Sequence, residues 1–233
     1  MTLSSLAAAR GLEMTAAQTP EALAMVLAQQ VAQALRSAIA LRGVARLALS
    51  GGRSPETFLR CLDAQPVEWS RVAITLVDER WVPPDDGASN EGMLRRCLSS
   101  GCAAARVLPL FRGVSPEQDA QAVSRELEAG LPLDVVVLGM GADGHCASLF
   151  PGQPRLDRLL DGAVGPICAA VSAPDGTPRM TLTATVLRSA RLQLLAISGD
   201  DKCRTLCQAF TAASEQMPVA AFLTPPLHIF YSP

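Results

Sequence analysis

The sequence has little of what marks several large classes of protein. Aromatic residues make up only 4% of its 233 residues and its net charge is −2, so it offers neither stacking platforms nor a basic face for nucleic acid. Its seven cysteines are scattered and contain no C-x-x-C pair, which excludes zinc-ribbon spacing. We therefore expect free thiols in a reducing compartment, no metal site and no nucleic-acid partner.

Long apolar runs are also missing. No stretch is long enough to cross a membrane, and residues 1–14 lack a basic region followed by an apolar one. We expect a cytoplasmic protein that has no secretory signal and makes no membrane contact.

Lysine is almost absent, since 19 of the 20 basic residues are arginine and only Lys202 is lysine. The lysine ammonium is more compact and mobile than the arginine guanidinium. If the composition of the chain has drifted toward arginine, lysine would be kept only at a position that needs such an ammonium. On composition alone, chance survival of one lysine is almost as good an explanation.

What the sequence does contain is an alternation of apolar strands and amphipathic helices. Its apolar fraction of 49% is enough for a sizeable core. We predict helices at 20–42, 54–62, 89–98, 115–128, 184–190 and 201–210. We predict strands at 44–50, 72–77, 107–110, 133–138, 166–172, 192–198 and 227–231, with 179–183 as strand or loop.

This alternation predicts one α/β domain over residues 1–233, with a mostly parallel sheet and helices on both faces. Ligands bind beyond the carboxyl ends of the strands in such sheets. The informative loops all lie there, at 50–55, 78–90, 139–148 and 198–202.

The loop at 139–152 reads G-M-G-A-D-G-H-C-A-S-L-F-P-G and contains one of only two histidines, His145. Histidine can exchange a proton with water near neutral pH, and glycines let a ligand approach the backbone. A lone histidine is more often structural, but the strand end and nearby Asp143 favour a catalytic one. Cys146 is not the nucleophile, because adjacent side chains point apart. His228 lies in an apolar run and fits a packed or partly exposed strand residue.

A second loop carries Ser50, Gly51, Gly52 and Arg53 between a strand and a helix. Backbone N–H groups in such a turn, with the helix N-terminus behind them, can seat an anion. On its own, paired glycine at a strand end is more often only a tight turn.

Further polar residues follow other strands. Asp78 and Arg80 come directly after the strand at 72–77, and Asn90 begins a helix. The plain alternatives are a surface ion cluster and a helix cap. Arg179 and Lys202 stand beside turns, where they and backbone N–H groups could hold a phosphate.

Together these segments resemble the 6-phosphogluconolactonase family of the oxidative pentose phosphate pathway. The resemblance rests on four segments: L-S-G-G-R-S-P at 49–55, D-E-R-W-V-P at 78–83 with S-N at 89–90, G-M-G-A-D-G-H-C-A-S-L-F-P at 139–151, and R-M-T at 179–181 with a lysine downstream. Glucosamine-6-phosphate deaminases share the D-G-H turn but continue it differently. Cys146 departs from the family pattern, which has threonine there.

The resemblance implies a Rossmann-like fold and hydrolysis of 6-phospho-D-glucono-1,5-lactone without metal or organic cofactor. His145 would be the general base on water, and Asp143 would orient it or bind a sugar hydroxyl. Glycine-turn N–H groups would face the oxyanion. The implied substrate-binding residues are Ser50, Gly51, Gly52, Arg53, Asp78, Arg80, Asn90, Gly141, Gly144, Arg179 and Lys202, of which Arg80, Arg179 and Lys202 are the candidates for the phosphate.

Two other functions stay open. One is an isomerase or deaminase acting on an amino-sugar phosphate. The other is a sugar-phosphate-binding protein without turnover. The presence of His145 argues against it, because a protein that only binds needs no base that works near neutral pH. The sequence leaves open whether the protein is a monomer or a homodimer.

Overall fold

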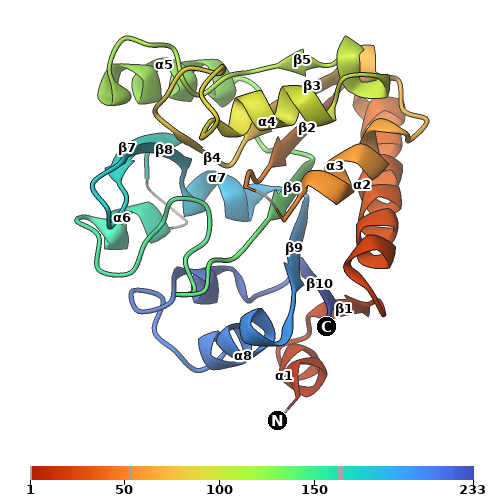
Figure 1. Cartoon of the computed structure of the whole chain (residues 1–233), viewed down its shortest axis with the longest axis vertical. Helices are drawn as coiled ribbons and strands as arrows, with labels where there is room; N and C mark the ends of the chain where they lie inside the picture. The colour runs from red at the N-terminus through yellow and green to blue at the C-terminus, as the bar shows by residue number, and fades with distance from the viewer. Residues whose placement is uncertain (1, 53, 162–164) are drawn as a thin grey trace.

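The computed structural model describes residues 2–52, 54–161 and 165–233 (Figure 1). Its larger sheet has seven strands in the order β1-β10-β9-β6-β2-β3-β5, and every pairing in it is parallel. These strands are β1 (Glu13–Ala16), β2 (Ala45–Leu49), β3 (Val72–Leu76), β5 (Arg106–Val107), β6 (Val135–Leu138), β9 (Leu192–Ser198) and β10 (Leu227–Ser232). The predicted α/β class with a mostly parallel sheet is confirmed.

A smaller antiparallel sheet, which the sequence pattern does not predict, has the order β4-β8-β7. Its strands are β4 (Asp78–Arg80), β7 (Cys168–Ser172) and β8 (Pro178–Leu182). The α-helices are α1 (Leu3–Ala9), α2 (Pro20–Arg42), α3 (Glu56–Asp63), α4 (Asn90–Cys97), α5 (Pro116–Glu128), α6 (Leu156–Leu160), α7 (Ala184–Ser189) and α8 (Asp200–Ala209). Within the described ranges, no helix is long and apolar enough to span a bilayer.

Figure 1 shows α2 and α3 on one side of the larger sheet, and α7 with the smaller sheet on the other. The long helix α2 begins as its sequence predicts: the Thr19 side chain accepts a hydrogen bond from the Ala22 backbone, and Pro20 occupies the first turn. It ends at Gly43, whose φ of 77° is the left-handed conformation that glycine tolerates.

Most predicted elements are present with shifted ends, one predicted strand is shorter and displaced, and three further elements were not predicted. The short strand expected at 107–110 is Arg106–Val107. The elements α1, β1 and α6 were not predicted. Only Leu3 and Ala7 of α1 are buried, and β1 is half exposed at the sheet edge, so neither carries a strong apolar period.

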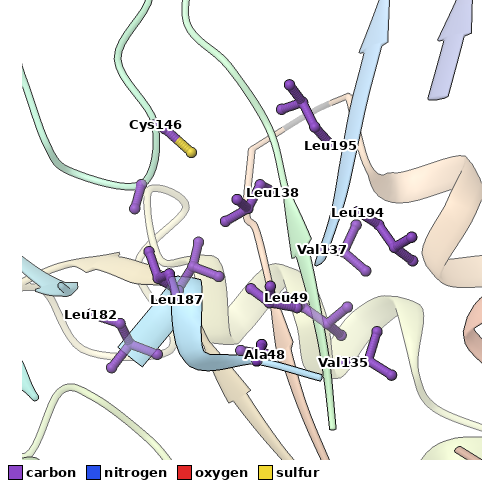
Figure 2. Close-up of a cluster of buried hydrophobic side chains, with 14 of the residues drawn as sticks. Ala48, Leu49, Val135, Val137, Leu138, Cys146, Leu182, Leu187, Leu194 and Leu195 are labelled. Carbon is purple, nitrogen blue, oxygen red and sulfur yellow. The ribbon is translucent and has the colours of Figure 1, made fainter. Parts of the chain in front are cut away.

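Side chains from the central strands fill the core beneath the carboxyl edge of the sheet. Figure 2 shows Ala48 and Leu138 on the side of the sheet where α7, β8 and the loop after β6 lie, and Val135, Val137 and Leu194 on the other side. Each is at most 4% exposed: Ala48, Leu49, Val135, Val137, Leu138, Cys146, Leu182, Leu187, Leu194 and Leu195. This packing fixes the level at which the strands stop and the loops begin.

The chain leaves the larger sheet at Val77. The Val77 N–H donates to the Leu49 carbonyl (2.9 Å) and the Leu182 N–H donates to the Val77 carbonyl (2.8 Å). The next residues pair with β8, which sets Asp78 opposite Thr181 and Arg80 opposite Arg179. This change from the larger to the smaller sheet places residues 78–80 beside residues 179–181, although about a hundred positions separate them in the sequence.

Glu79, between them, is fully buried, so the surface-cluster interpretation fails for this residue. Its carboxylate accepts hydrogen bonds from the backbone N–H groups of Arg80 (2.8 Å), Asn90 (2.7 Å) and Glu91 (2.7 Å) and from the Ser89 hydroxyl (3.1 Å). Burial raises the pKa of Glu79 above its usual value, although these hydrogen bonds act to lower it. Glu79 thereby ties β4 to the start of α4.

We predict that Glu79→Ala lowers the free energy of unfolding by about 3 kcal/mol or more, because each stranded buried donor costs about 1–3 kcal/mol. Urea denaturation measures the change. Glu68→Ala is the control: Glu68 forms an exposed ion pair with Arg71, and its loss should cost less than about 1 kcal/mol. Equal losses in the two variants would contradict the role given to Glu79.

Candidate active site

A cavity of about 360 Å³ opens at the carboxyl ends of β2, β6 and β9. That volume lies within the usual range for small-molecule sites. Most of the predicted site residues line it: Ser50, Gly51, Gly52, Asp78, Arg80, Asn90, Gly141, His145, Arg179 and Lys202. Asp143 and Gly144 stand behind this lining, and Arg53 lies outside the described residues.

The turn that carries His145 requires glycine. The Gly141 N–H donates to the His145 carbonyl (2.9 Å), and a Cβ at Gly141 would lie 2.1 Å from the His145 ring. Gly144 has a φ of 80° and packs against Met217, while its carbonyl accepts a hydrogen bond from the Val219 N–H (2.9 Å). The Gly144 N–H donates to the Gly141 carbonyl (3.1 Å), so the N–H groups of both glycines are used within the turn.

Asp143 holds the imidazole of His145. Its Oδ1 lies 2.6 Å from His145 Nδ1 and 3.1 Å from the His145 backbone nitrogen. Partial burial acts to raise the pKa of Asp143, but the hydrogen bonds and charge of His145 outweigh it and hold that pKa below its usual value. With Nδ1–H donated to the carboxylate, the lone pair is on Nε2, which has no hydrogen-bond partner among the described residues.

Two arginines meet across the β4–β8 pairing. Arg80 donates to the Ala88 carbonyl (3.1 Å) and to Asn90 Oδ1 (2.6 Å), which fixes its guanidinium. Arg179 has a buried Nε without a hydrogen-bond partner. Burial first, and then the charge of Arg80, lower the pKa of Arg179. An anion in the cavity would relieve both effects.

Lys202 is a third cation at the cavity, on the first turn of α8. It is half buried, and this burial lowers its pKa. Within the described part of the chain it has no ion-pair or hydrogen-bond partner. Like Arg179, it is a partly buried charge that forms no ion pair with the described residues, which is typical of an anion site.

Several predicted residues hold the loops together. The Ser50 hydroxyl donates to the Val137 carbonyl (2.9 Å) and accepts from the Gly139 N–H (3.0 Å), so it joins the loops after β2 and β6. Asn90 Nδ2 donates to the Asp78 carbonyl (3.0 Å). A Cβ at Gly51 would lie 2.0 Å from the Asn90 side chain, which explains the glycine.

Two residues at the site go beyond the predicted set. Phe150 lines the cavity and its ring centroid lies 4.8 Å from that of His145. The Ser148 hydroxyl donates to Asp78 Oδ2 (2.6 Å) and so ties the His145 loop to β4. Their only signal in the sequence is their position in the loop at 139–152, since neither contact can be read from spacing.

The structure also shows the surroundings of the second histidine and of the cysteine next to His145. His228 lies on β10 with a side chain 12% exposed and its Nε2 2.9 Å from Thr15 Oγ1, which confirms a packed strand residue. Cys146 is fully buried, and burial raises the pKa of its thiol, so a Cys146 nucleophile is not supported. Among the described residues, no group of three or more histidine, cysteine or acidic side chains is arranged to hold a metal ion.

The chain is similar to known proteins along most of its length. The family model described as glucosamine-6-phosphate isomerases/6-phosphogluconolactonase matches residues 18–228. A 6-phosphogluconolactonase of Pseudomonas aeruginosa is 47% identical over 212 residues, covering 89% of each chain. One of Rhizobium meliloti is 42% identical, covering 93% of this chain and 97% of its own.

Solved structures agree with these relatives. A 6-phosphogluconolactonase of Shewanella baltica superposes with a TM-score of 0.91 at 33% identity, covering 95% of this chain and 98% of its own. A monomeric glucosamine-6-phosphate deaminase has a TM-score of 0.79 at 18% identity, covering 95% of this chain and 97% of its own, which shows a shared fold alone. The chain therefore belongs to the glucosamine-6-phosphate isomerase/6-phosphogluconolactonase family and, within it, to the 6-phosphogluconolactonase group.

Proposed function

We propose that this protein hydrolyses 6-phospho-D-glucono-1,5-lactone to 6-phospho-D-gluconate, with His145 as the general base. One observation carries the proposal: the same cavity contains a carboxylate-held imidazole and three cations, Arg80, Arg179 and Lys202. The relatives named above are 6-phosphogluconolactonases, and the similarity extends over most of their length, which supports this substrate.

A δ-lactone is an activated ester, so water is a sufficient nucleophile when a base assists it. His145 Nε2 takes a proton from water as the water oxygen attacks C1, and the ester carbonyl becomes a tetrahedral oxyanion. The imidazolium then returns the proton to the departing ring oxygen. Such assistance is worth roughly 10²–10⁴-fold in rate. Asp143 stays ionised and stabilises the imidazolium between the two steps.

The rest of the cavity holds the substrate. Arg179 and Lys202 form no ion pair with the described residues, and we assign the phosphate to them with Arg80 beside them. Gly51 and Gly52 line the cavity, and their N–H groups have no hydrogen-bond partner within the same described ranges. They, rather than those of Gly141 and Gly144, remain as donors to anionic oxygens of the substrate.

The alternative functions can be separated by assay. A deaminase would release ammonia from an amino-sugar phosphate, and a binding protein would bind the sugar phosphate without turnover.

The seven cysteines are all free, which supports our expectation of a reducing, cytoplasmic compartment.

We expect His145→Asn to lower kcat by about 10²-fold or more, because the base is lost. Its affinity for 6-phosphogluconate, measured by calorimetry, should change less than about threefold, because the cations remain. Rates are measured at controlled pH on freshly generated lactone, with spontaneous hydrolysis subtracted. His228→Asn, on β10, is the matched control and should keep the wild-type rate. A fully active His145→Asn enzyme would refute the assignment of the base.

For Lys202→Ala, KM for the phosphorylated lactone should rise about tenfold or more, whereas KM for unphosphorylated gluconolactone should hardly change. The reason is that a charge-assisted contact to phosphate is lost. Arg204→Ala removes an exposed cation of the same helix, paired with Asp201, and serves as the control. Equal effects of Lys202→Ala on both substrates would remove Lys202 from the phosphate site.

Asp143→Asn should lower kcat, because the imidazolium that forms during the reaction loses its neighbouring negative charge. In the wild-type enzyme, Asp143 itself should add no limb to the pH profile of kcat/KM near neutrality. Its pKa lies below its usual value, so it is ionised well before the assay range begins. An unchanged kcat in this variant would mean that Asp143 does not act on His145.

A further inference from the structure

Phe150 has no part in the function proposed above, yet it packs against the residue on which that function depends. The ring centroids of Phe150 and His145 are 4.8 Å apart and their planes are tilted by 51°. Phe150 is 6% exposed and carries no polar side-chain atom that could handle a proton. Its contact with the imidazole therefore acts through packing.

A tight turn brings the two rings together although five positions separate them. Ala147 has a φ of 52°, a conformation that non-glycine residues rarely adopt. The Leu149 N–H donates to the Cys146 carbonyl (3.1 Å) and closes the turn. A strained backbone held in place by its surroundings is common where a side chain must be aimed.

Further hydrogen bonds hold Ser148, within this turn, and Phe150, directly after it. The Ser148 N–H donates to Thr181 Oγ1 (3.2 Å), and the Ser148 hydroxyl donates to Asp78 (2.6 Å). The Phe150 N–H donates to Gln153 Oε1 (3.0 Å). The two bonds of Ser148 tie the turn to β4 and β8, and the bond of Phe150 holds its backbone to the segment that follows.

We propose that Phe150 is a positioning residue for His145, an inference that rests on the proposed function. The Asp143 hydrogen bond fixes Nδ1 but leaves the imidazole free to tilt about that contact. Phe150 packs against the imidazole and limits the tilt, which keeps Nε2 directed at the water that attacks C1. A small misplacement of a catalytic group is enough to lower a rate by one or two powers of ten.

We expect Phe150→Leu to lower kcat about tenfold while KM changes less than twofold, because the base is misplaced but the phosphate site is intact. Phe150→Tyr keeps the ring and should restore most of the rate. The chain offers a matched control: Phe230 lies 4.5 Å from the ring of His228 and is 1% exposed. Phe230→Leu removes the same ring from a similar pair, away from the cavity lining, and should leave kcat unchanged.

A spectroscopic readout tests the positioning directly. The chain has only two histidines, so labelling histidine with ¹⁵N gives two ring spin systems in long-range ¹H–¹⁵N spectra. Phe150→Leu should shift and broaden the His145 ring signals and leave those of His228 in place. Phe230→Leu should do the reverse.

Three results would overturn the proposal. Unchanged His145 signals in Phe150→Leu would show that the ring does not hold the imidazole. A rise in KM with kcat unchanged would make Phe150 a substrate contact instead. A normal kcat with lowered stability would make it a core residue only. Any of these results, together with an inactive His145→Asn enzyme, removes the role of Phe150 and leaves the proposed function standing. An active His145→Asn enzyme removes both.

Discussion

The chemistry proposed for this protein depends on the hydrogen bond between Asp143 and His145. A carboxylate 2.6 Å from Nδ1 decides which ring nitrogen carries the proton and leaves the other free toward the cavity. The fold supports this pair from the C-terminal half of the chain. The Val219 N–H donates to the Gly144 carbonyl, and the Thr205 hydroxyl donates to the Ala142 carbonyl (3.2 Å).

A second feature of the cavity is the group of cations that lines it. Glu79 and Asp78 accept hydrogen bonds from neighbouring elements, and their charges act on Arg179 without forming an ion pair with it. Arg179 and Lys202 are partly buried and make no ion pair with the described residues. Exposed arginines elsewhere, by contrast, pair with acidic residues on the surface. Arg80, Arg179 and Lys202 thus line one cavity, and this grouping of positive charge is the reason for the phosphate site that we propose.

The local sequence pattern predicted most helices and strands. It did not predict which segments distant in the sequence pair with one another. The helix at 20–42 and the strand at 133–138 carry their own caps or continuous apolar runs. The strand at 78–80 consists of three charged residues and exists because β8 pairs with it. The burial of Glu79 depends on donors ten or more positions away. The glycine loop located the site, but the contact of Phe150 with the imidazole required the backbone turn at 146–149.

The most direct test of the central claim is a crystal structure with 6-phosphogluconate bound. The account predicts the C1 carboxylate within about 3 Å of His145 Nε2, and the phosphate in contact with Arg179 and Lys202. A product bound with its phosphate at the imidazole, or outside this cavity, would contradict it.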